Sequence, residues 1–193
     1  MKKLFLALLL VSIAFSSCKQ ESKKDSQAVL PKRKIDNVLS KILNDKFPNY
    51  RSNNLIKGKA VQEIKVKIDS LAPLNYLDDI PLQVLNISKN PHGKGALVQF
   101  TTNGNNIVLN NNYSDNVCFD VISFMSEEIA STLIDKEIYY VYGKKWVRLD
   151  KKEVNALVKY TWYGTETEIN NDDNDIILGN FLVEVDSLKL YEK

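Results

Sequence analysis

The chain has 193 residues and a formal net charge of +2, with 44% hydrophobic and 26% charged residues. A length in this range is typical of one domain, because a single hydrophobic core usually serves about 100 to 200 residues. The hydrophobic fraction excludes a disordered chain, and 7 glycines, 5 prolines and 2 cysteines exclude a collagen-like or disulfide-rich one. We therefore expect a folded globular body.

The N-terminus has the pattern of an export signal. A basic start at Lys2 and Lys3 is followed by a largely apolar run over residues 4–15. This run is too short for a transmembrane helix, which needs about 20 apolar residues, and it suits the apolar part of a signal peptide. We expect the chain to be exported.

The residues that follow resemble the lipobox of bacterial lipoproteins, with Ala14-Phe15-Ser16-Ser17 directly before Cys18. Phe15 departs from the leucine usual at its position. The resemblance implies that residues 1–17 are a signal peptide that is removed, and that Cys18 becomes the acylated N-terminus that anchors the protein in the membrane. Several acyl chains anchor stably, because each buried CH₂ contributes roughly 0.8 kcal/mol. An ordinary signal peptide with a chance cysteine near its cleavage site is the alternative.

Residues 18–34 form a basic stretch beside the expected anchor, with six basic and two acidic side chains. This composition predicts a flexible tether near anionic headgroups, although a linker whose charges only keep it soluble explains it equally well. Lys19 stands where an Asp would resemble the inner-membrane retention signal of proteobacterial lipoproteins, so the resemblance implies the outer membrane. The charged run also resembles the tethers of Bacteroidota surface lipoproteins. Whether the domain faces the periplasm or the exterior stays open.

Residues 35–80 have helical patterning. Apolar residues recur at helical spacing over residues 35–47, before Pro48, and again over residues 56–71, before Pro73. Asn53 or Asn54 is the expected cap of the second helix. We predict a helical segment here.

From residue 81 to residue 193 the pattern changes to short β-branched and aromatic runs between Asn, Gly and Asp clusters, which predicts a β-rich domain. The Gly and Pro content of residues 90–95 predicts a hairpin connection. Ser126, with Glu127 and Glu128 behind it, predicts the start of one short inserted helix. Gly179 predicts a bend or break in the last strand. The expected strands cover residues 82–87, 96–102, 107–109, 117–124, 137–142, 146–149, 154–163 and 176–190.

This order predicts an α+β fold, with N-terminal helices followed by a mostly antiparallel β barrel or sandwich that contains one inserted short helix. It is compatible with a Greek-key barrel of the OB type. Residues 81–190 resemble the OB-like exported domains of Bacteroidota lipoproteins, although no diagnostic motif carries the resemblance. Another α+β sandwich or barrel is the alternative.

The residues that usually carry catalysis are scarce. His92 is the one histidine and stands in a turn, and Cys118 lies between apolar residues where a buried thiol is expected. One histidine and one remaining thiol do not assemble a common zinc site. The acidic positions 166, 168, 172, 173 and 175 could hold calcium, but they lack the spacing of an EF-hand loop, which favours a solvated loop. We predict no catalytic residue, no metal and no cofactor.

A stretch rich in aromatic and basic residues spans positions 139–163. Aromatic faces beside cations can stack on sugars or on a protein partner, although alternation along strands would place about half of the rings in the core. We predict a lipid-anchored, non-enzymatic envelope protein that binds protein or glycan and no nucleic acid. The alternatives are an exported hydrolase using a carboxylate pair and a structural component of an envelope complex. The candidate binding residues are Tyr139, Tyr142, Trp146, Arg148, Tyr160 and Trp162.

Overall fold

The computed structural model describes residues 34–102, 116–170 and 175–192. Cys18, the expected tether up to residue 33, the strand expected at 107–109 and the acidic positions 172 and 173 lie outside the described residues. Helices come first in the chain and most strands follow, so the expected α+β class is confirmed. The helices that precede the sheet are α1 (Lys34–Ser40), the π-helical η1 (Lys41–Lys46), α2 (Asn54–Leu71) and the 3-10 turn η2 (Ala72–Leu74).

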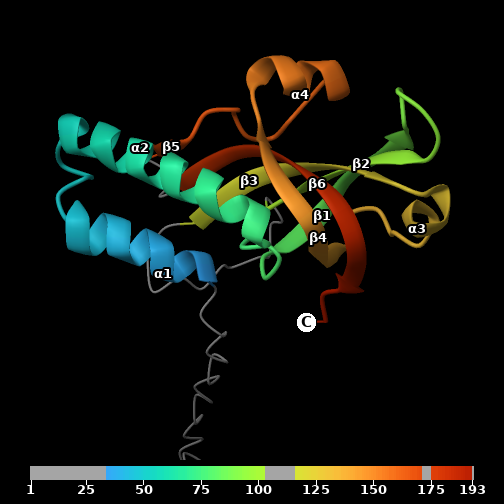
Figure 1. Cartoon of the computed structure of the whole chain (residues 1–193), viewed down its shortest axis with the longest axis horizontal. Helices are drawn as coiled ribbons and strands as arrows, with labels where there is room; N and C mark the ends of the chain where they lie inside the picture. The colour runs from blue at the N-terminus through green and yellow to red at the C-terminus, as the bar shows by residue number, and fades with distance from the viewer. Residues whose placement is uncertain (1–33, 103–115, 171–174, 193) are drawn as a thin grey trace, which may run out of the picture.

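The longest helix, α2, forms where the apolar spacing predicted it. Asn53 caps its first turn, because its side-chain oxygen accepts hydrogen bonds from Leu55 N at 3.0 Å and Ile56 N at 3.2 Å. Its buried side is a stripe at four-residue spacing, and in Figure 1 α2 runs beside α1 at one end of the strands. The stripe consists of Ala60, Ile64 and Ile68.

Within the part of the chain that the structure describes, no helix combines the length and apolar character needed to cross a bilayer.

The strands form one six-stranded sheet, with the order β3-β2-β1-β4-β6-β5. Strand β3 also pairs with β6, and this pairing is parallel, whereas the other pairings in the described residues are antiparallel. The strands are β1 (Pro81–Lys89), β2 (Ala96–Thr101), β3 (Asn116–Met125), β4 (Ile138–Leu149), β5 (Glu168–Asn170) and β6 (Asp175–Leu190), with α3 (Glu127–Ser131) between β3 and β4, and α4 (Lys151–Leu157) after β4.

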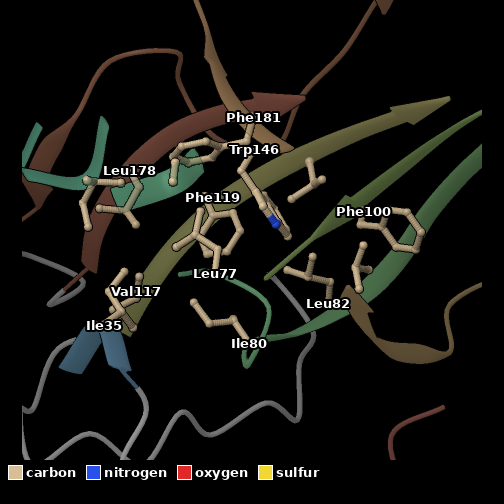
Figure 2. Close-up of a cluster of buried hydrophobic side chains, with 14 of the residues drawn as sticks. Ile35, Leu77, Ile80, Leu82, Phe100, Val117, Phe119, Trp146, Leu178 and Phe181 are labelled. Carbon is tan, nitrogen blue, oxygen red and sulfur yellow. The ribbon is translucent and has the colours of Figure 1, made fainter. Parts of the chain in front are cut away.

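The main hydrophobic core joins the helical segment to one face of the sheet. Figure 2 shows its aromatic centre, where the Phe119 ring meets the Phe181 ring edge-on with the centroids 5.6 Å apart. Ile35 of α1 reaches the same cluster, so helices and strands share one core. This shared burial is the largest source of stability, since apolar area removed from water contributes roughly 25 cal/mol per Å².

A second, smaller core lies on the opposite face of the sheet. Leu97 and Ile122 belong to it, while their chain neighbours Val98 and Val121 belong to the main core, as strand alternation requires. Helix α4 contributes Val154 to this second core, and in Figure 1 it stands apart from α1 and α2. Both faces of β2 and β3 are therefore covered.

Several expectations from the sequence are confirmed at residue level. The hairpin connection is closed by a hydrogen bond from Asn90 N to Gly95 O at 3.0 Å. Ser126 caps α3, because its hydroxyl accepts from Ile129 N at 3.2 Å. Gly179 has φ +92, and the β3–β6 register shifts beside it, so the last strand bends without breaking.

The strand expected at residues 154–163 is wrong. Residues 151–157 form α4, and residues 158–167 cross the sheet without strand pairing. The cause is a capping box in which Asp150 Oδ1 accepts from Glu153 N at 2.8 Å and Glu153 Oε2 accepts from Asp150 N at 2.7 Å. The strands expected at 137–142 and 146–149 are also one strand, β4, whose pairing with β6 shifts register around Gly143.

Candidate functional site

A groove of about 550 Å³ lies between the β1–β2 hairpin and the segment that follows α4. We call residues 158–167 the strap. A register shift between Val84 and Asn86 places Asn86 opposite Gln99, and both side chains line the groove. Such bulges re-aim side chains, which here brings two amides to one surface. The wall on the other side includes Val158, Lys159 and Tyr160 of the strap.

The polar side chains of the groove hold one another in place. Asn86 Nδ2 donates to Gln99 Oε1 at 3.2 Å, and Gln99 Nε2 donates to Tyr160 O at 2.9 Å. Ser88 Oγ donates to Leu97 O at 3.3 Å. The two amides are therefore fixed before a ligand arrives, which lowers the entropy cost of binding.

Two exposed aromatic rings stand on the strap beside this groove. Tyr160 is 61% exposed and Trp162 is 49% exposed, and their rings meet edge-on with centroids 6.0 Å apart. Among the aromatic side chains that the structure describes these two are the most exposed, and exposed rings are favourable contact points for a ligand. Both residues are among the binding candidates predicted from the sequence, and the structure brings them together.

The electrostatic character of the groove is basic. Its lining contains Lys89 and Lys159, both exposed, and the described residues that line it include no aspartate, glutamate or histidine. A ligand with negative charge would therefore meet attraction at both walls without an opposing carboxylate.

Buried polar side chains fasten the strap to the sheet. Tyr163 N donates to Asp120 Oδ2 at 2.8 Å, and Asn180 Nδ2 donates to Gly164 O at 3.1 Å. Asp120 is 2% exposed, and this burial raises the pKa of its carboxyl to about 6. Hydrogen bonds from the main-chain N–H groups of Tyr163 and Trp162 and from the Thr101 side chain oppose this rise. The exposed rings thus stand on a segment that is fixed from below.

Three of the predicted binding residues have structural positions instead. Trp146 is 0% exposed and its Nε1 donates to Asp78 Oδ1 at 2.7 Å. Tyr139 is buried, and its hydroxyl accepts from Ile134 N at 3.1 Å. Arg148 is bonded to Asp69 and to the Leu178 carbonyl, with its guanidinium 5.0 Å from the Phe181 ring centroid. These side chains stabilise the fold and are not available as a surface.

Tyr142 belongs to a different aromatic cluster. Its ring lies 6.5 Å from that of Tyr140, which in turn lies 5.6 Å from that of Tyr191. The six predicted residues therefore divide into the core, this cluster on β4 and the pair beside the groove. The sequence missed Asn86, Ser88 and Gln99; polar residues within apolar strands were the signal that could have indicated them.

The scarce reactive residues stay out of the groove lining. Cys118 is 4% exposed, and burial raises the pKa of its thiol to about 12. His92 is exposed in the β1–β2 turn, where its main-chain N–H donates to Asn90 Oδ1 at 2.8 Å. Among the residues with described positions, no three His, Cys, Asp or Glu side chains gather as metal ligands would.

Comparisons with protein-family models, with curated proteins and with solved structures gave no significant match. Function must therefore be argued from the groove and the residues around it.

Proposed function

We propose that this protein is a lipid-anchored, non-enzymatic binding module of the cell envelope, and that the groove holds an extended glycan that carries carboxylate groups. The observation that carries the proposal is the pair of exposed rings, Tyr160 and Trp162, on a strap beside a groove with fixed amides. Aromatic faces stack on the apolar faces of sugar rings, and a few placed polar groups then set the orientation.

The charge of the groove selects the class of glycan. Lys89 and Lys159 would each meet a sugar carboxylate, and hydrogen bonds between ionised groups are stronger than neutral ones. The amides of Asn86 and Gln99 and the hydroxyl of Ser88 are suited to sugar hydroxyl groups. A protein partner would also find apolar lining here, but it does not account for the amide pair and the two cations as directly.

The strand order supports an OB-like barrel as the finer description of the fold. Pairing passes from β3 through β2, β1 and β4 to β6, and β6 pairs with β3 again. In OB folds the second and third strands, with the loops after the first and fourth strands, bind oligosaccharides or oligonucleotides. The groove lies beside the corresponding segments, which are the β1–β2 turn and the strap.

Binding of polygalacturonate tests the proposal, with dextran as the uncharged comparison. The soluble Cys18→Ser form is measured by biolayer interferometry at low and high salt. We expect polygalacturonate to bind more tightly than dextran. Tyr160→Ala or Trp162→Ala should weaken binding about 5- to 150-fold, since a stacked ring contributes about 1 to 3 kcal/mol.

Matched controls separate this groove from the rest of the surface. Tyr142→Ala removes a ring from the other aromatic cluster and should leave binding unchanged. The double variant Lys89→Gln, Lys159→Gln should lose the preference for polygalacturonate and its salt dependence. If neither polysaccharide binds, or if the Tyr160 and Trp162 variants bind like the wild type, the proposal fails.

The anchor is tested by its chemistry. Cells fed a labelled palmitate should yield a labelled mature protein that begins at Cys18, and Cys18→Ala should abolish both the label and the cleavage of the leader. Label that persists in this variant would contradict the anchor, because no other residue is proposed to carry the acyl chains.

A further inference from the structure

We propose that Asp120 is a positioning residue that controls how firmly the strap docks, so that binding in the groove tightens as the medium becomes more acidic. The inference deepens the proposed function, on which it rests, because the strap carries Tyr160 and Trp162. Asp120 is not among the residues that line the groove, and it acts through its hydrogen bond to the strap.

The geometry behind this inference is a row of polar side chains on neighbouring strands. Gln99 of β2, Asp120 of β3 and Asn180 of β6 are all buried, and β3 pairs with both other strands. Each bonds to the main chain of the strap, at Tyr160 O, Tyr163 N and Gly164 O respectively. The docked position of the strap, which carries Tyr160 and Trp162, thus depends on side-chain hydrogen bonds from the sheet.

Asp120 is the member of this row that can change its charge. Neutral Thr101 and Asn180 flank it on the adjacent strands, and Arg148 of β4 is bonded to Asp69. The pKa values of Cys118 and Tyr163 are raised by burial, so both groups stay neutral across the physiological range. Asp175 of β6 faces these two groups and not Asp120.

The sign follows from the two positions of the strap. Burial in the docked state raises the pKa of the carboxyl to about 6, even though hydrogen bonds from the strap oppose the rise. In this proposal, lifting the strap returns the carboxyl to water, and its pKa falls toward the ordinary value of 3.8. The docked state therefore binds the proton more tightly, and docking strengthens as the pH falls through about 6. By linkage, the docking equilibrium constant rises about tenfold from pH 7 to pH 5.

Ligand affinity follows this equilibrium. A groove whose wall and rings are in place only in the docked state has its apparent affinity reduced by the undocked fraction. A lower pH reduces the undocked fraction, so polygalacturonate should bind more tightly at pH 5 than at pH 7.

Hydrogen exchange at the Tyr163 amide reports docking directly, because this N–H donates to Asp120. In the full mature chain with Cys18→Ser, we expect its protection to be about tenfold greater at pH 5 than at pH 7, after correction for intrinsic exchange. Asp120→Asn keeps a side-chain oxygen for the Tyr163 N–H but cannot ionise, so both its protection and its polygalacturonate affinity should lose this pH dependence. Asp186→Asn, an exposed change on β6, should keep the wild-type profile.

The outcomes distinguish the two proposals. Protection of Tyr163 that does not change with pH in the wild type, or a profile that survives in Asp120→Asn, overturns the role of Asp120. Failure of polygalacturonate to bind at every pH overturns the proposed function, while the exchange data still test the strap. Should Asp120→Asn not fold, the carboxyl carbon of Asp120 in the wild type must titrate near pH 6 by nuclear magnetic resonance, and a midpoint near 4 refutes the inference.

Discussion

Replacing Trp146 by phenylalanine tests whether this ring holds the core together. The ring is fully buried, contacts the Phe181 ring edge-on at 6.5 Å and donates from Nε1 to Asp78 Oδ1 at 2.7 Å. Phenylalanine keeps part of the ring contact and removes the donor. We expect the variant to fold with reduced stability and with unchanged binding in the groove.

The size of the loss can be built from these contacts. A hydrogen bond to a charged acceptor contributes about 1.5 to 3 kcal/mol, and the smaller ring leaves a cavity that costs about 1 to 2 kcal/mol. The expected loss is about 2.5 to 5 kcal/mol, a large part of the roughly 5 to 15 kcal/mol of a typical domain. Burial already raises the pKa of Asp78 and the Trp146 bond opposes this rise, so the loss should be smaller in acid, where a protonated Asp78 no longer needs that donor.

Urea unfolding followed by circular dichroism measures the loss, and a double-mutant cycle assigns it. Trp162→Phe, on the exposed ring of the strap, should change stability by less than about 0.5 kcal/mol. Combining Trp146→Phe with Asp78→Ala should cost about 1 to 2 kcal/mol less than the sum of the single changes. A loss below 1 kcal/mol for Trp146→Phe, or strict additivity with Asp78→Ala, would refute the reasoning.

Further changes are expected to act in stated directions. Gly58 in α2 has no atom within 4 Å of an added Cβ, so Gly58→Ala should stabilise by about 1 kcal/mol through helix propensity. A Cβ at Gly143 would lie 2.1 Å from Val183 Cγ2, so Gly143→Ala should destabilise by about 1 to 3 kcal/mol, and thermal melts of the pair should shift in opposite directions. Asp150→Ala should lose about 1 kcal/mol with the capping box, and Asp150→Asn should lose less, as urea midpoints would show. Cys118, as the sole cysteine of a variant, should react with a thiol reagent slowly in the native state and quickly in urea, and fast native labelling would contradict its burial.

The order of helices and strands could be predicted from local patterns. Cap residues such as Asn53 and Ser126 mark the starts of helices, because each accepts a hydrogen bond from a main-chain N–H only two or three residues further along the chain. Both capping hydrogen bonds are present as expected. Residues 154–163 were misread because their apolar positions suit a strand, whereas the capping box at Asp150 favours a helix. A local signal decided this segment, and it was available in the sequence.

The groove could not be predicted in the same way. Asn86 and Gln99 meet through a strand register that includes a bulge, and Tyr160 joins them from a segment 61 residues beyond Gln99. The periodicity of β4 does not predict that Trp146 is buried, because the register shift between Gly143 and Trp146 changes which positions of the strand face the core. Side-chain exposure was therefore settled by tertiary packing and not by alternation.

The pairings of the long strand β6 determine how late in synthesis the sheet can be completed. It pairs with β3, β4 and β5, and it is the last described strand along the chain. Because these partners cannot be joined until β6 has emerged, the sheet remains incomplete through most of synthesis. A chain that postpones its tertiary structure in this way stays largely unfolded until β6 is available, so its folding is governed by pairing between strands far apart in the sequence.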